Sequence, residues 1–177
     1  MHITTKGDKV LDKPLVEIGG KGLFISEIEN ALLDGTIDIA VHSAKDLPVQ
    51  LADGLEIPCV LERADVRDCL IVRNGENYAE SDKFCIGTGS LRRRISAGKY
   101  YPNAEFMDIR GNVDTRINKL LHHEYDGLIL AKAGLDRLGI VSDERINIIP
   151  FDADFLPAPC QAIIAVECRE DSEFKSV

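Results

Sequence analysis

The feature that most constrains the fold is a regular alternation of short apolar runs and amphipathic segments across residues 84–131. Apolar runs at Phe84–Ile86, Ala104–Ile109 and Leu128–Ala131 indicate strands. Helical patterns lie between them, at Leu91–Tyr100 and Val113–Leu121, because apolar residues recur there every three or four positions. This order predicts right-handed strand–helix–strand units, and hence an α/β fold with mostly parallel sheets.

Two stretches interrupt this pattern and suggest the domain organisation. The first, Glu62–Asp68, has five charged residues among seven, and the second carries three prolines between residues 150 and 159. We expect the chain to cross between two α/β domains at these stretches. The first domain is then discontinuous, formed by residues 1–62 and 157–177, and the second is formed by residues 63–156.

Composition excludes several classes of protein. The 177 residues carry 21 basic and 30 acidic side chains, a formal charge of −9, which argues against a nucleic-acid or anionic-membrane partner. The apolar runs are too short to span a bilayer, and the first residues lack the pattern of a secretion signal. The five cysteines form no CxxC motif and favour reduced thiols, so we expect a cytoplasmic protein.

A glycine-rich turn, Gly87–Arg94, joins a predicted strand to a predicted helix. Backbone N–H groups at such a turn, with the Thr88 and Ser90 hydroxyls, form a candidate anion site. The sequence is not a Walker loop, and Arg92 occupies the third glycine position of a dinucleotide fingerprint. The alternative is a simple helix cap followed by a solvated basic face, since adjacent arginines cannot all face one ligand.

The segment Asp108–Arg116 follows the next predicted strand and adds Arg110 and Arg116. Carboxyl ends of parallel strands meet at one edge of a sheet, so these arginines are expected near the glycine-rich turn. Residues 86–116 hold six basic and three acidic side chains, a local charge of +3 in an acidic chain. Such concentrated arginine suggests capture of carboxylates or phosphates by forked hydrogen bonds.

A third cluster, Val41–Pro48, follows a β-branched run. Asp46 is a candidate to move a proton or stabilise a cation, although Lys45 and Asp46 could also be a simple surface pair. His42 alternates to the side opposite Ser43 and is interpreted as a packed histidine.

The remaining candidates are weaker. The Gly19–Gly22 loop presents the cation of Lys21, or is only a flexible turn. The adjacent histidines in His122–Glu124 lack the spacing of a helical zinc site, so we expect no metal. Four cysteines lie in or beside apolar runs and are expected to be buried; they are Cys59, Cys69, Cys85 and Cys168.

The strings at residues 41–46 (VHSAKD), 90–93 (SLRR) and 110–116 (RGNVDTR) resemble the porphobilinogen deaminase, or hydroxymethylbilane synthase, family. The resemblance covers essentially the whole chain, in order. It implies two periplasmic-binding-protein-like domains and a transferase of porphyrin and heme biosynthesis. Such an enzyme joins four porphobilinogen units, releasing ammonia, to make hydroxymethylbilane on a dipyrromethane cofactor.

The resemblance also implies roles for individual residues. Asp46 would be the catalytic carboxylate, which holds pyrrole N–H groups and stabilises a cationic intermediate. Arg110 and Arg137 would bind the substrate's side chains. The residues that would hold cofactor carboxylates are Lys21, Ser43, Lys45, Thr88, Ser90, Arg92, Arg93 and Arg116.

The sequence departs from the family pattern in several places. It starts after the family's opening strand and stops before the third domain, whose cysteine carries the cofactor, so we expect a fragment that is inactive alone. Gly89 stands where the family has serine, and Cys160 and Ala162 stand where it has hinge glycines. Full length, we expect a monomer. The alternative function is a non-catalytic module that binds small anions; the carboxylate of Asp46 argues against it.

Overall fold

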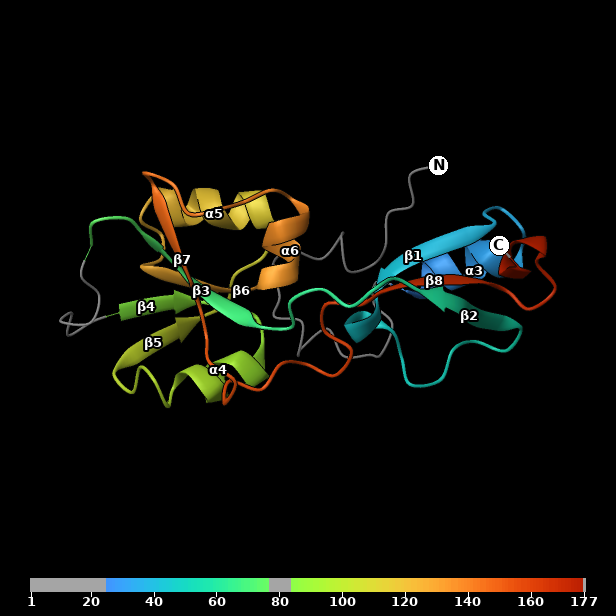
Figure 1. Ribbon diagram of the computed structural model, residues 1–177, viewed down its shortest axis with the longest axis horizontal. Coiled ribbons are helices and arrows are strands. Elements are labelled where there is room, and N and C mark those ends of the chain that lie inside the picture. Colours follow the sequence, from blue (N-terminus) through green and yellow to red (C-terminus); the bar gives the residue numbers. More distant parts are fainter. Residues whose placement is uncertain (1–24, 77–83, 177) are drawn as a thin grey trace. The chain divides into compact units, whose positions relative to one another are not determined.

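The computed structural model describes residues 25–76 and 84–176 (Figure 1). The chain divides into two compact units, the first unit being Met1–Ala64 with Pro159–Val177 and the second unit Asp65–Ala158. The second domain expected from sequence, 63–156, begins and ends two residues earlier than this unit.

The second unit is built on one five-stranded sheet. Its strands, in spatial order, are β5 (Ala104–Met107), β4 (Phe84–Gly87), β6 (Gly127–Ala131), β3 (Asp68–Arg73) and β7 (Ile146–Pro150). The predicted strand–helix–strand part is parallel: β4 pairs in parallel with β5 and with β6. The strands next to the crossings are not, because β3 runs antiparallel to both β6 and β7. The α/β class is confirmed, and parallel pairing is limited to the strand–helix–strand part.

Helices cover both faces of this sheet. They are α4 (Leu91–Ala97), α5 (Val113–Leu121) and α6 (Lys132–Arg137), and Figure 1 shows α5 and α6 on one side of the strands and α4 on the other. Every residue of β3 is buried, as expected for a strand covered on both faces. No helix in the described part of the chain is both long and apolar enough to cross a bilayer.

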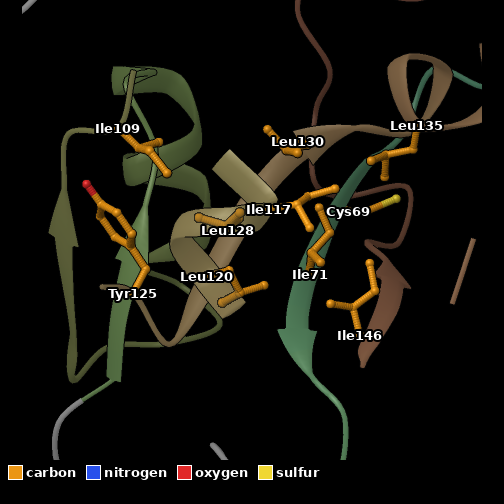
Figure 2. Close-up of a cluster of buried hydrophobic side chains, with 10 residues drawn as sticks. All are labelled: Cys69, Ile71, Ile109, Ile117, Leu120, Tyr125, Leu128, Leu130, Leu135 and Ile146. Atoms are coloured by element: carbon orange, nitrogen blue, oxygen red, sulfur yellow. The ribbon is translucent and has the colours of Figure 1, made fainter. Parts of the chain in front are cut away.

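Two apolar clusters fill the spaces between sheet and helices. Figure 2 shows the first, in which Ile71 of β3 and Leu128 of β6 pack with Ile117 and Leu120 of α5 and Leu135 of α6. The second lies on the opposite face and joins alternate residues of the same strands to α4; it contains Leu70, Val72, Phe84, Ile86, Ala97, Ile129, Phe151 and Phe155. The alternation of side chains along each strand therefore supplies both layers of the core.

The described part of the first unit is a three-stranded sheet beside one helix. Its elements are α3 (Ser26–Leu33), β1 (Ile39–Ser43), the 3₁₀ turn η1 (Ala44–Asp46), β2 (Leu55–Val60), β8 (Ile164–Arg169) and the 3₁₀ turn η3 (Glu173–Ser176). The strand order is β1–β8–β2, and both pairings are antiparallel. Leu32, Ala40 and Leu55 form its buried apolar cluster.

The segment that leads into β8 has an unusual backbone. Cys160 has φ of 57° and Ala162 has φ of 74°, in the left-handed region that favours glycine. Gln161, between them, is fully buried, and its carbonyl accepts a hydrogen bond of 3.0 Å from Arg63 Nε. Ala64 N donates to Ala162 O at 3.1 Å, so the two segments of this crossing are hydrogen-bonded to each other.

Candidate functional site

The glycine-rich turn after β4 is closely packed. A Cβ at Gly87 would lie 2.8 Å from Tyr125 Cδ1 and 2.9 Å from Leu128 Cδ2, so any other residue there would force these side chains to move. Thr88 is 1% exposed, and its hydroxyl accepts from Ser90 N at 3.3 Å. The Ser90 hydroxyl caps α4 by accepting from Arg93 N at 3.4 Å. Both predicted hydroxyls therefore help to build the turn itself.

Arg92 and Arg93 converge on one buried carboxylate that sequence reasoning missed. Asp68, at the start of β3, is fully buried, and its Oδ1 accepts from Arg93 Nε at 3.0 Å and Nη2 at 2.7 Å. Arg92 Nη2 lies 2.8 Å from Asp68 Oδ2. Arg93 Nη1 also donates to Ile129 O at 3.1 Å, and Arg92 Nη1 to Leu156 O at 2.6 Å. The two guanidinium groups are thus held in place before any ligand arrives.

The third arginine of the run points elsewhere. Arg94 pairs with Asp108 and donates to the Thr88 carbonyl at 3.2 and 3.3 Å. The three adjacent arginines therefore do not face one ligand, as expected from their positions around a helix. Arg94 stabilises the turn, while its two neighbours contact the carboxylate of Asp68.

Arg110 and Arg116 bring further positive charge to the same part of the second unit. Arg116 Nε donates to Gly111 O at 2.7 Å, at a turn where Gly111 has φ of 106°. Burial lowers the pKa of Arg116, and repulsion from the charges of Arg93 and Arg110 lowers it further. Arg116 therefore lies near enough to Arg93 and Arg110 for their charges to repel it. That the three arginines bind one ligand stays a prediction. An anionic ligand would relieve this repulsion.

Arg137, the other predicted substrate residue, is exposed at the end of α6. Helix α6 begins directly after β6, at the edge of the sheet where β4 ends. Its contact with substrate stays a prediction.

The second group of predicted residues follows β1, in the first unit. Ser43 and Lys45 are half-buried and Asp46 is exposed, on the turn η1. Ala44 N donates to Ile163 O at 3.0 Å, and Leu47 N donates to Ala44 O at 3.3 Å, so the turn is hydrogen-bonded to the segment before β8. An exposed carboxylate at this place is accessible to a polar substrate.

His42 is packed as predicted, and its partner was missed. The side chain is 8% exposed, and Nε2 lies 2.9 Å from Oε2 of Glu167, which is fully buried in β8. A signal was present in the sequence, since Glu167 directly follows the apolar run 162–166. Likewise, Asp68 directly precedes the apolar residues of β3, although its charged stretch reads as a solvated crossing.

Other predictions have mixed outcomes. Lys21 lies outside the described residues. Cys69 and Cys168 are buried, and burial raises the pKa of the Cys69 thiol to about 11. Cys59, predicted to be buried, is exposed, because it lies on β2, where only Leu55 is buried.

Comparisons with known proteins bear on this arrangement. The profile of the family described as "Porphobilinogen deaminase, dipyromethane cofactor binding domain" matches residues 1–176. Porphobilinogen deaminase of Streptococcus sanguinis (strain SK36) is 49% identical over 173 residues, covering 96% of this chain and 56% of that protein. The enzyme of Geotalea uraniireducens (strain Rf4) is 49% identical over 174 residues, covering 98% and 54%. The chain thus spans about half the length of the curated relatives it matches.

Among solved structures, prephenate dehydratase of Arthrobacter aurescens in complex with L-Phe has a TM-score of 0.52 and 13% sequence identity. The likeness covers 83% of this chain and 50% of that one, and it concerns the fold alone.

Proposed function

Because the chain belongs to the porphobilinogen deaminase family, we propose that it forms the cofactor-binding part of a hydroxymethylbilane synthase. The reaction joins four porphobilinogen units head to tail, and each condensation releases one ammonia. This places the chain in porphyrin and heme biosynthesis. The cysteines favour a cytoplasmic enzyme, and we propose that the full-length protein is a monomer.

The observation that carries the proposal is the set of arginines held in the second unit of an otherwise acidic chain: Arg92 and Arg93 contact the buried Asp68, and Arg116 is hydrogen-bonded to Gly111. Pyrroles of this pathway carry acetate and propionate groups, whose carboxylates suit forked guanidinium donors. A non-catalytic anion-binding module would use the same arginines. Membership of an enzyme family and the Asp46 carboxylate on its exposed turn favour the enzyme instead.

The residues present fit a cofactor that bears several carboxylates. Burial and mutual repulsion depress the pKa of Arg116, so bound anionic groups would stabilise the cluster. Those we propose to hold the dipyrromethane are Ser43, Lys45, Thr88, Ser90, Arg92, Arg93 and Arg116, with Lys21 outside the described residues. When bound, this cofactor supplies the point at which the pyrrole chain grows. The contacts of Arg92 and Arg93 with Asp68 hold their guanidinium groups ready for it.

We propose that Asp46 is the catalytic carboxylate. Its oxygens accept hydrogen bonds from pyrrole N–H groups, and its negative charge stabilises the positive charge that develops on the substrate pyrrole as ammonia leaves. Preorganised charge of this kind is worth about 3–4 kcal/mol in the transition state. Arg110 and Arg137 would orient the substrate by its carboxylate side chains.

Titration of porphobilinogen into the purified chain, followed by calorimetry, tests the arginine cluster. Arg110→Gln removes a guanidinium proposed to contact the substrate and should weaken binding at least tenfold. Arg145→Gln is the matched control, because Arg145 is an exposed arginine of the same unit that pairs with Asp143. Equal affinity of the two variants would contradict the proposed function.

A further inference from the structure

The pair formed by His42 and Glu167 joins β1, the strand that leads to the turn with Asp46, to β8, the central strand of the sheet. His42 lies on β1 and Glu167 on β8, with Nε2 and Oε2 2.9 Å apart. In the antiparallel register Ala40 faces Glu167 and His42 faces Ala165, so the two side chains are diagonal neighbours on one face. Their exposed fractions are 8% and 0%.

This pair is the last buried side-chain contact of β1 before the turn that carries Asp46. The apolar cluster of the first unit includes Ala40 but not His42. After His42 the burial falls away: Ser43 and Lys45 are half-buried and Asp46 is exposed. Apolar packing thus holds the start of the strand, and the polar pair holds its end.

The pair also restricts the register of β1. Side chains alternate with a period of two, so moving β1 forward by two residues leaves the same side chains on each face. Such a shift would bring the charged Asp38 to the place of Ala40, opposite Glu167, so the cluster of Leu32, Ala40 and Leu55 opposes it as well. The shift would set His42 opposite Ile163, four positions from Glu167, and break the contact. It would also move Asp46 by about 6.8 Å, at about 3.4 Å per residue.

Stability alone does not account for this pair. A buried pair of ionisable groups pays a desolvation penalty that apolar residues of similar size avoid. Among the described residues, Glu167 Oε1 has no hydrogen-bond partner, which adds to the penalty. Buried polar groups of this kind are best attested as devices that specify register, as in coiled coils.

We propose that His42 and Glu167 are positioning residues, which hold the end of β1 on β8 and thereby place the turn that carries Asp46. Neither residue touches substrate. That this placement serves catalysis by Asp46 rests on the proposed function. That the pair holds the end of β1 on β8 does not. The contact acts through the hydrogen bond from Ala44 N to Ile163 O, which continues the β1–β8 ladder into the turn.

Amide hydrogen exchange of the full chain, read by NMR, tests the proposal without any need for turnover. The reporters are the hydrogen-bonded amides of Ala44 and Leu47 in the turn; the amides of Ile37 and Leu55 serve as references in the same unit. His42→Leu should speed exchange of the turn amides at least tenfold, and that of the reference amides less than threefold. Glu167→Gln retains a hydrogen-bonding side chain and should keep the turn amides within threefold of the original rate.

The double variant His42→Leu with Glu167→Leu separates positioning from stability. It removes both buried polar groups, so its melting temperature should equal or exceed that of the original chain. The turn amides should nevertheless exchange at least tenfold faster, because the hydrogen bond between the two side chains no longer holds the end of β1 on β8. This variant keeps the proposal testable even if His42→Leu alone fails to fold.

Arg169→Gln is the matched control, since Arg169 Nη1 binds the carbonyls of Leu32 and Ile37, near the other end of β1. It should speed exchange at Ile37 and leave Ala44 unchanged. The proposal would be overturned if the amides of Ala44 and Leu47 exchanged at the original rate in the double Leu variant. It would also be overturned if His42→Leu sped exchange of the turn amides and the reference amides equally. Failure to bind porphobilinogen would instead refute the proposed function and leave these exchange rates as they are.

Discussion

The two turns that carry the candidate site differ in how firmly their side chains are held. In the second unit, Thr88 is 1% exposed, Arg93 is 8% exposed, and both are hydrogen-bonded within the protein. In the first unit, Asp46 is exposed, and the last buried side chain before it is His42. The comparison suggests that the groups proposed to bind the carboxylates of the cofactor are built into the core. The group proposed to act on a changing charge is an exposed side chain on a turn that is held by its backbone hydrogen bonds.

The largest effect on stability is expected when the buried carboxylate of Asp68, which pairs with the arginines after the glycine-rich turn, is removed. Asp68→Ala leaves the guanidinium of Arg93 buried without a counter-charge, which should lower the free energy of unfolding by about 3–5 kcal/mol. Urea denaturation measures this loss. Replacing both Asp68 and Arg93 by leucine should recover much of it, since the buried charge is then gone and Arg92, which also pairs with Asp68, is partly exposed. A loss below about 1 kcal/mol in the single variant would show that the turn does not depend on this pair.

Substitution of the exposed side chain on the turn after β1 should change function and not stability. Asp46→Asn removes an exposed charge, so the melting temperature should stay within a degree of the original. Turnover of porphobilinogen by the full-length enzyme should fall by about 10²–10³, the effect of losing one preorganised charge. Normal turnover in this variant would contradict a catalytic role for Asp46. The two turns would then differ in exposure but not in function.

A smaller effect should come from the backbone of the tightly packed turn. Gly87→Ala places a Cβ within 2.9 Å of Tyr125 and Leu128, and overpacking of this kind costs about 1–3 kcal/mol. Gly134→Ala is the matched control, because no atom of the described residues lies within 4 Å of the added Cβ and alanine favours helix α6 by about 1 kcal/mol. In thermal denaturation, Gly87→Ala should lower the melting temperature and Gly134→Ala should raise it. A change in the same direction in both variants would mean that the turn can accommodate the added methyl group.

The smallest effect should be seen at an exposed ion pair of the second unit. Hydrogen bonds from the Arg145 side chain, and from the backbone N–H groups of Arg145 and Ile146, lower the pKa of Asp143 to about 2. Because the folded-state value lies below the unfolded value of about 3.9, the stabilisation is present above pH 4 and is lost as the pH falls toward 2. The carboxyl carbon shift of Asp143 measures the titration, and the Ile146 amide should exchange faster at the acid end. Titration at the ordinary value would show that the pair does not form in solution.

Periodicity predicted much of the fold, because strands β4, β5 and β6 alternate with amphipathic helices. It missed α6, which begins directly after β6 with no turn residue between them and no side-chain cap. It also missed β7, which ends in a proline. The direction of β3 was not readable, since antiparallel pairing with β6 depends on a partner more than fifty residues away.

The residues of the candidate site could be proposed from the sequence, whereas the residues that support them could not. Arginines and hydroxyls cluster in short motifs, so local sequence indicates them. Asp68 meets Arg93 across 25 positions, and His42 meets Glu167 across 125. No local pattern encodes such contacts, and each support appears in the sequence only as an isolated charge beside an apolar strand.

The left-handed backbone at Cys160 and Ala162 has a consequence for engineering. Improved stability usually comes at the expense of mobility, and activity often suffers as a result. Here stability and mobility need not conflict. A side chain in the left-handed conformation costs about 1–2 kcal/mol, and glycine avoids this cost, although glycine loses more backbone entropy on folding. Glycine at both positions would relieve strain and widen the range of backbone angles at the same time. The crossing is therefore a place where a more stable protein can also be a more flexible one.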